Sequence, residues 1–201
     1  MIKNVIFDIG NVLVDFRWRS LMEELQLPIE TQKRFEKTVF GSPWWGELDH
    51  GIYEEAEILA HFREDNKDHL DAFNLLWDNR DKLVAPYAYA VQWIEQLKKS
   101  GFKLYLLSNY PRDVFALHTE CGCFPFLEHV DGKVVSGFVK MVKPNADIYE
   151  HLLREYGLEP EECVFIDDRA ENVEAARVLG MKGIVFAGYE QACEELKKML
   201  S

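Results

Sequence analysis

The chain has 201 residues, of which 48% are hydrophobic and 29% charged, as in folded globular proteins. Its 35 acidic and 23 basic residues give a formal net charge of −12, which disfavours binding to nucleic acid backbones. No apolar run approaches the ~20 residues that a membrane-spanning helix needs. The N-terminal apolar run meets Asp8 and Gly10 too early for a signal peptide. We therefore expect a cytoplasmic protein with neither nucleic acid nor membrane partners, and a monomer by default.

Four continuous apolar runs predict buried parallel strands, at residues 4–9, 103–107, 163–166 and 183–186. Apolar residues at helical spacing separate the later strands, over about residues 91–97, 148–156 and 173–179, and each of these runs stops near a glycine. Residues 190–200 are predicted to form a surface helix. This alternation predicts an α/β fold with a doubly wound parallel sheet, in which ligands bind outside the carboxyl ends of the strands.

Residues 15–84 interrupt this alternation. They show helical periodicity without a convincing strand, and they contain four of the five tryptophans. We predict a small all-helical cap inserted after the first strand, with residues 1–14 and 85–201 forming the α/β core. The tryptophans are expected mainly in the core of the cap. The exception is the pair Trp44 and Trp45, for which the nearby glycines and proline predict a loop that could contact a substrate.

Three of the predicted strands end in polar residues: Asp8 at the end of the first, Ser108 and Asn109 at the end of the second, and Asp167 and Asp168 at the end of the third. Carboxylates that converge at one edge of the sheet repel one another, and a divalent cation such as Mg²⁺ removes that penalty. The Ser108 hydroxyl and the Asn109 amide suit phosphate oxygens, and Lys143 could bring a positive charge to the same place.

The cysteines carry a weaker signal. All four fit a reducing compartment, and Cys121 and Cys123 form a C-x-C pair without a matching second pair. A zinc site is therefore not expected.

Four segments, VIFDIGNVLVDF, LYLLSN, VKPNADIY and VFIDDRAENVEAARVLG, resemble the four motifs of the haloacid dehalogenase superfamily in the same order. The resemblance covers residues 1–14 and 85–190, and it implies a Rossmann-like core with a helical cap of the C1 type. The FD-x-GNV segment and the tryptophan-bearing cap are most similar to a branch of sugar-phosphate phosphatases. The implied activity is Mg²⁺-dependent hydrolysis of a small phosphorylated metabolite through an aspartyl phosphate.

The resemblance also implies a role for individual residues. Asp8 matches the nucleophile, and Ser108 and Lys143 match the hydroxyl and the cation that assist it. The implied phosphate-binding residues are Ser108, Asn109, Lys143 and Asn11. The implied Mg²⁺ ligands are Asp8, the Gly10 carbonyl oxygen and Asp168. Asp167 is implied as a secondary ligand or a holder of metal-bound water, and Asn172 is expected to brace this loop.

One position departs from the family pattern. Most phosphatases of this superfamily carry a second Asp two residues after the nucleophile, where this chain has Gly10, and glycine cannot transfer a proton. Three explanations stay open: a substrate with a good leaving group, a proton supplied by Asp49 or His50 of the cap, or a vestigial site that only binds a phosphorylated ligand.

Two further alternatives concern the class of protein. A metal-independent haloacid dehalogenase would attack carbon, but it would leave the paired charges of Asp167 and Asp168 uncompensated. The fold could also serve as the scaffold of an interaction protein.

Overall fold

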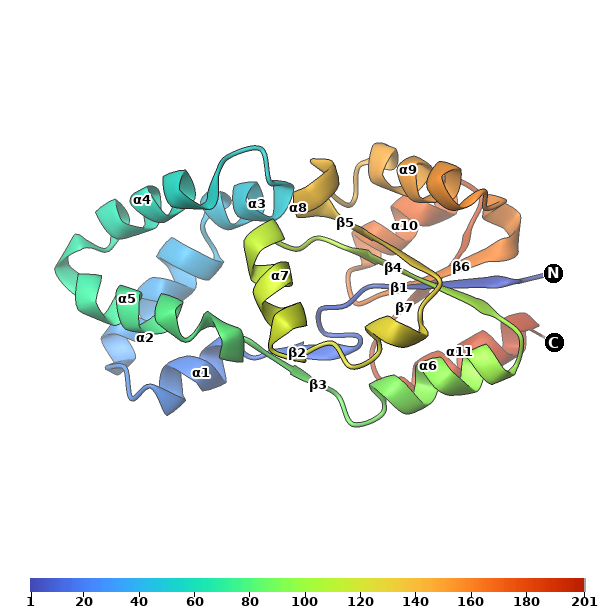
Figure 1. Cartoon of the computed structure of the whole chain (residues 1–201), viewed down its shortest axis with the longest axis horizontal. Helices are drawn as coiled ribbons and strands as arrows, with labels where there is room; N and C mark the ends of the chain where they lie inside the picture. The colour runs from blue at the N-terminus through green and yellow to red at the C-terminus, as the bar shows by residue number, and fades with distance from the viewer. Residues whose placement is uncertain (201) are drawn as a thin grey trace.

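The computed structural model describes residues 1–200 and is built around a five-stranded parallel sheet in the order β5-β4-β1-β6-β7 (Figure 1). The strands are β1 (Asn4–Phe7), β4 (Lys103–Ser108), β5 (Gly132–Val135), β6 (Cys163–Asp167) and β7 (Lys182–Val185). Both neighbours of β1 run parallel to it, with Phe7 level with Leu106 of β4 and with Ile166 of β6. The predicted doubly wound α/β sheet is confirmed.

Helices cover both faces of this sheet, with α6 and α11 below it and α9 and α10 above it in Figure 1. The remaining elements of this part are α6 (Ala90–Lys99), α7 (Arg112–Glu120), η4 (Leu127–His129), α8 (Ser136–Val139), α9 (Ala146–Tyr156), η5 (Pro160–Glu162), α10 (Ala170–Val178) and α11 (Tyr189–Leu200). The helices predicted around 91–97, 148–156 and 173–179 correspond to α6, α9 and α10.

The strands of the sheet alternate between two hydrophobic cores, because successive side chains of a strand point to opposite faces. Phe7 packs in the same core as Trp93 of α6 and Leu196 of α11. Ile6, its neighbour in β1, packs in the other core with Tyr149 of α9. Burial on both faces explains why the strand sequences are continuously apolar.

A helical region lies at one end of the molecule and is joined to the sheet through β2 and β3 (Figure 1). Its elements are α1 (Trp18–Glu24), α2 (Ile29–Phe35), the π-helical turn η1 (Glu36–Phe40), α3 (Pro43–His50), α4 (Glu55–Asp65), η2 (Lys67–His69), α5 (Leu70–Asp78) and η3 (Arg80–Lys82). Division of the chain into a cap at residues 15–84 and a core stays a prediction, and we use "cap" below for the helices α1 to α5.

Three strands, β2, β3 and β5, were not predicted from the sequence. β2 (Val14–Phe16) and β3 (Val84–Pro86) pair antiparallel at the two ends of the interval in which no strand was expected, and three residues each are too few to show a pattern. β5 was also missed, because only two of its four residues, Val134 and Val135, are buried.

The prediction that Trp44 and Trp45 lie in a loop was wrong, because both belong to α3. The Ser42 side chain caps this helix by accepting a hydrogen bond from the Trp44 backbone N–H at 3.2 Å, and Pro43 occupies the first turn, where its missing N–H costs nothing. Ser-Pro at this position starts a helix, although the surrounding glycines suggested a loop.

Candidate active site

The carboxyl ends of three adjacent strands bring the predicted polar residues together. Asp8 follows β1, Ser108 ends β4, and Asp167 ends β6 with Asp168 directly after it. One carboxylate oxygen from each of the three aspartates lies within 4.8 Å of the others. Among residues 1–200 this is the only such group of three or more potential metal ligands.

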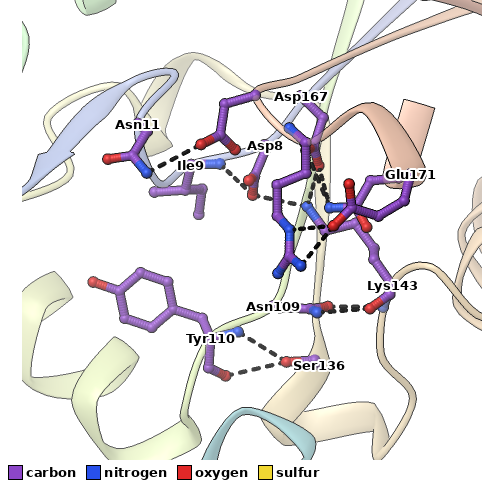
Figure 2. A network of polar contacts seen from close by, with 12 residues as sticks. Asp8, Ile9, Asn11, Asn109, Tyr110, Ser136, Lys143, Asp167 and Glu171 are labelled. Atoms are coloured by element: carbon purple, nitrogen blue, oxygen red, sulfur yellow. Dashed lines mark hydrogen bonds and ion pairs between the residues drawn. The ribbon is translucent and has the colours of Figure 1, made fainter. Parts of the chain in front are cut away.

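Lys143 is the buried cation of this cluster and is only 4% exposed. Its Nζ lies 3.0 Å from Oδ1 of Asp8 and 2.6 Å from Oδ2 of Asp167 (Figure 2). The ammonium therefore bridges the carboxyl ends of β1 and β6. Because it serves two carboxylates at once, the pKa of Lys143 is raised despite its burial.

The side chain of Asn109 holds Lys143 in place. Its Nδ2 donates to the Lys143 carbonyl oxygen at 2.9 Å, and its Oδ1 accepts from the Lys143 backbone N–H at 2.8 Å (Figure 2). The side-chain amide was expected to contact phosphate, but both of its polar atoms are engaged with the backbone. Its observed contacts instead support positioning of Lys143.

Asp167 is fully buried, and both of its oxygens have partners. Oδ1 accepts from the Arg169 backbone N–H at 2.8 Å, Oδ2 contacts Lys143, and Nδ2 of Asn172 lies 3.1 and 3.0 Å from the two oxygens. The expected bracing role of Asn172 thus takes the form of a bond to Asp167. These contacts suit Asp167 to orient Lys143 better than to ligate a metal.

Asp168 is more open and lies beside the loop that follows Asp8. Asn11 donates from Nδ2 to Oδ2 of Asp168 at 3.1 Å (Figure 2). Asn11 has a positive φ of 55°, a conformation that Asn tolerates better than most residues, in the turn between Gly10 and β2. This hydrogen bond thereby connects the turn after Asp8 to the residue that follows β6.

The electrostatics of the cluster indicate a missing positive charge. Three ionised carboxylates opposed by one ammonium leave two negative charges uncompensated. Burial, reinforced by the charge of Asp167, raises the pKa of Asp8 to about 6, although Lys143 and Ser108 oppose the shift. Burial also raises the pKa of Asp168.

This donor set fits Mg²⁺. Hard carboxylate and carbonyl oxygens are the ligands that Mg²⁺ prefers, and a divalent cation would offset the two uncompensated charges. Asp8, Asp168 and the Gly10 carbonyl would hold the ion, and Asp167 would add its negative charge nearby.

The raised pKa of Asp8 predicts how stability depends on pH without metal. Between the unfolded value of 3.8 and about 6, folded Asp8 keeps a proton that the unfolded chain has lost, so its contribution to stability falls as the pH rises through this window. In EDTA, Asp8→Asn should therefore gain in Tm relative to the wild type between pH 4 and pH 7.

Saturating Mg²⁺ at pH 7 should stabilise the wild type, by about 2.7 kcal/mol at 100 times Kd. Thermal melts with EDTA and with Mg²⁺ test both, and the absence of any Mg²⁺ effect would contradict the metal assignment.

A cavity of about 270 Å³ opens in front of these residues. Asp8, Ser108 and Lys143 line its floor, together with Gly10, Asn11, Asn109 and Asp168. Opposite, the cap contributes Phe40, Trp45 and Asp49, and β2 contributes Phe16. The aromatic rings contact one another, with centroids 5.0 Å apart for Phe40 and Trp45 and 5.7 Å apart for Phe16 and Trp45. Trp45 thus does face the cavity, although from a helix.

Sequence reasoning missed two polar residues of the cavity wall, Tyr110 and His118. The Tyr110 hydroxyl lies 2.5 Å from Nδ1 of His118, whose Nε2 is 2.7 Å from the Arg80 carbonyl oxygen. Burial raises the pKa of Tyr110 well above its usual value and lowers that of His118, so both are neutral at pH 7. The one sequence signal for either residue is that Tyr110 directly follows Ser108 and Asn109, and His118 had none.

Residues 2–180 match the haloacid dehalogenase-like hydrolase family, and the chain therefore belongs to this family of hydrolases. A sesquiterpene phosphatase of Aspergillus oryzae is 26% identical, over 98% of this chain and 96% of that protein.

Two solved structures show the same fold at 22% identity. A predicted HAD-like family hydrolase from Porphyromonas gingivalis has a TM-score of 0.76, covering 100% of this chain and 98% of its own. A HAD family enzyme from Bacteroides thetaiotaomicron, in complex with magnesium and inorganic phosphate, has a TM-score of 0.73, covering 94% of this chain and 96% of its own.

Two other expectations from the sequence concern membrane-spanning helices and the cysteines. No helix among residues 1–200 is long and apolar enough to cross a membrane. The four cysteines are free thiols, and Cys163 is the buried one.

Proposed function

We propose that the chain is a Mg²⁺-dependent phosphomonoester hydrolase that acts on a small phosphorylated compound through an aspartyl phosphate on Asp8. The observation that carries this proposal is the cluster at the strand ends, where three carboxylates lie within 4.8 Å of one another at the floor of a cavity and two of them contact one buried lysine. Phosphoryl transfer requires alignment and positive charge more than covalent chemistry, and the cluster is suited to supply both.

Each residue has a distinct part in this reaction. Asp8 attacks phosphorus and displaces the organic group. The Ser108 hydroxyl and the Lys143 ammonium bind the phosphoryl oxygens, and Asn109, Asp167 and Asn172 keep Lys143 in place. When bound, Mg²⁺ reduces the repulsion between the anionic nucleophile and the anionic phosphate.

The relatives support a phosphatase over the alternatives. The Aspergillus oryzae relative is a phosphatase, and the Bacteroides thetaiotaomicron structure holds magnesium and inorganic phosphate. A metal-independent dehalogenase would leave the two negative charges of this site uncompensated, because Lys143 is the one ammonium in contact with the cluster among the described residues.

The cavity wall indicates the kind of organic group. Phe16, Phe40 and Trp45 line it side by side, and an aromatic lining suits a flat or apolar group. A sugar ring has apolar faces that meet this requirement, and an isoprenyl chain meets it too. A sugar phosphate therefore stays one of two substrate predictions.

The test is a panel of sugar phosphates, isoprenyl phosphates, acyl phosphates and p-nitrophenyl phosphate, assayed for phosphate release with Mg²⁺ and with EDTA. We expect hydrolysis with Mg²⁺ and its loss in EDTA. Tight binding of phosphorylated ligands without turnover would instead indicate a vestigial site. Halide release from 2-haloacids in EDTA would indicate a dehalogenase.

A further inference from the structure

The floor of the cavity has no uncommitted group that could protonate the leaving alcohol, because Asp8 is the proposed nucleophile and Asp168 the proposed metal ligand. Gly10 stands two residues after Asp8, and Lys143 is held between two carboxylates. Tyr110 and His118 are bonded to each other, and His118 also contacts a carbonyl oxygen. A proton donor for the reaction must therefore come from another wall of the cavity.

We propose that Asp49 of the cap is the general acid and base of this site. It would protonate the leaving-group oxygen in the first step and accept a proton from the attacking water in the second. This inference rests on the proposed phosphatase function. It assigns to a cap helix the task that the glycine at position 10 cannot perform.

The position of Asp49 is fixed by close packing of the cap against the core. Asp49 lies in the last turn of α3, and its carbonyl oxygen accepts a hydrogen bond of 2.5 Å from the Ser136 hydroxyl. The same hydroxyl accepts from the Tyr110 backbone N–H at 2.8 Å (Figure 2). Ser136 thus links the end of α3 to the loop that follows Ser108 and Asn109.

Two glycines make this approach possible. Gly51, which ends α3 with a φ of 70°, is so close to α8 that a Cβ on it would lie 2.5 Å from the Gly137 carbonyl oxygen. A Cβ on Gly137 would in turn lie 2.4 Å from the Arg112 backbone nitrogen. Backbone therefore packs on backbone here, which brings the end of α3 close to the loop that follows Ser108 and Asn109.

The carboxyl group of Asp49 is available for chemistry. It lines the cavity together with Asp8 and Lys143, and it has no hydrogen bond or ion pair with any residue in the described part of the chain. An unpaired carboxyl group close enough to Asp8 to feel its charge has no evident structural role. His50, the other candidate, points elsewhere, because its Nε2 lies 3.2 Å from the Lys140 carbonyl oxygen and it does not line the cavity.

The surroundings of Asp49 suit proton transfer near neutral pH. Burial and the charge of Asp8 raise the pKa of Asp49 to about 7, and Lys143 and Arg169 oppose the shift. Tyr110 and His118, on the adjoining wall, are neutral and add no charge. A carboxyl group with a pKa near the operating pH can both give and accept a proton.

Every bond and proton is accounted for in the two steps. In the first, a carboxylate oxygen of Asp8 bonds to phosphorus, the bond between phosphorus and the leaving oxygen breaks, and that oxygen takes the Asp49 proton and departs as an alcohol. In the second, a water oxygen bonds to phosphorus while Asp49 takes a water proton. The bond between Asp8 and phosphorus then breaks, which releases phosphate and restores both aspartates.

Asp49→Asn tests the assignment when it is assayed on leaving groups of different basicity. An alkyl phosphate needs protonation of its leaving oxygen, whereas p-nitrophenolate leaves without it. We expect kcat/KM for the alkyl phosphate to fall by about 10²–10⁴-fold. We expect a much smaller loss for p-nitrophenyl phosphate, and loss of the alkaline limb of the pH–rate profile near pH 7. Glu47→Gln, which removes a carboxylate from the same helix outside the cavity, should leave both rates unchanged.

Equal losses on the two substrates, or a rise in KM alone, would show that Asp49 binds substrate and would overturn the proposal. Unchanged rates would overturn it as well. These outcomes differ from failure of the phosphatase assignment, in which the wild type itself would hydrolyse none of the compounds with Mg²⁺. Thermal melts of each variant exclude misfolding as a cause.

The open space at Gly10 allows a second test. A Cβ added there meets no atom within 4 Å, so a side chain at this position can start without a clash. In the Asp49→Asn background, Gly10→Asp introduces a carboxyl group two residues after Asp8, and we expect recovery of alkyl phosphate hydrolysis relative to p-nitrophenyl phosphate. A double variant with the same substrate preference as Asp49→Asn alone would argue that a missing proton donor was not the cause of the loss.

Discussion

Replacing Asp8 by Asn is expected to lower kcat/KM for every phosphate ester by about 10⁴-fold or more, since the substitution removes the nucleophile itself. The amide keeps the size of the side chain, and the Ile9 N–H and Lys143 contacts are made to one oxygen, which the amide can also provide. The fold should therefore be retained. Initial rates of phosphate release with saturating Mg²⁺ measure the effect.

Asp15→Asn is the matched control for this variant. Asp15 lies in β2, close in sequence to the site, but it does not line the cavity. It should keep the wild-type rate. If Asp8→Asn retained a substantial part of the activity while Asp15→Asn behaved as expected, Asp8 would not be the nucleophile.

The second large effect is expected on stability. Lys143→Met should lower the free energy of unfolding in EDTA by about 3–5 kcal/mol, the usual cost of removing one partner from a buried ion pair. The Lys143 ammonium is buried between Asp8 and Asp167, whose carboxylates would then face each other without a cation. Chemical denaturation at pH 7 measures the loss.

Acid and Mg²⁺ should each recover part of this stability. Protonation of Asp8 removes one of the two negative charges that repel each other. A cation bound near Asp8 offsets both. The control is Lys182→Met, which removes an exposed lysine at the start of β7. A loss for Lys143→Met no larger than for Lys182→Met would show that the buried contacts contribute little.

The sheet and the strand ends were predictable from the sequence because both depend on short-range patterns. Strands buried on two faces are continuously apolar, and a parallel arrangement places their carboxyl ends at one edge. The residues Asp8, Ser108 and Asp168 could therefore be grouped without coordinates. Lys143 lies in a loop before α9 and has no pattern of its own, so only its charge and the family resemblance pointed to it.

The roles of Asn109 and Asp167 could not be predicted, because each depends on which contacts its polar atoms make. Asn109 uses both side-chain atoms on the Lys143 backbone, and Asp167 has donors on both oxygens. Residue type alone suggested a phosphate contact for the first and a metal contact for the second. Side-chain geometry changes both interpretations.

The cap was the least predictable part of the site. Its helices were expected, but the orientation of Asp49 depends on the glycine contacts between α3 and α8 and on the Ser136 bridge, which join residues nearly ninety positions apart. Asp49 and His50 could not be distinguished in the sequence. In the structure only Asp49 reaches the cavity.

Trapping the covalent intermediate tests the central claim most directly. The protein is mixed with substrate and Mg²⁺, quenched rapidly in acid, digested and mapped by mass spectrometry. We predict one phosphoryl group per chain on the peptide that contains Asp8, absent in EDTA and absent in Asp8→Asn. A phosphoryl group on another residue, or its appearance without Mg²⁺, would contradict the account.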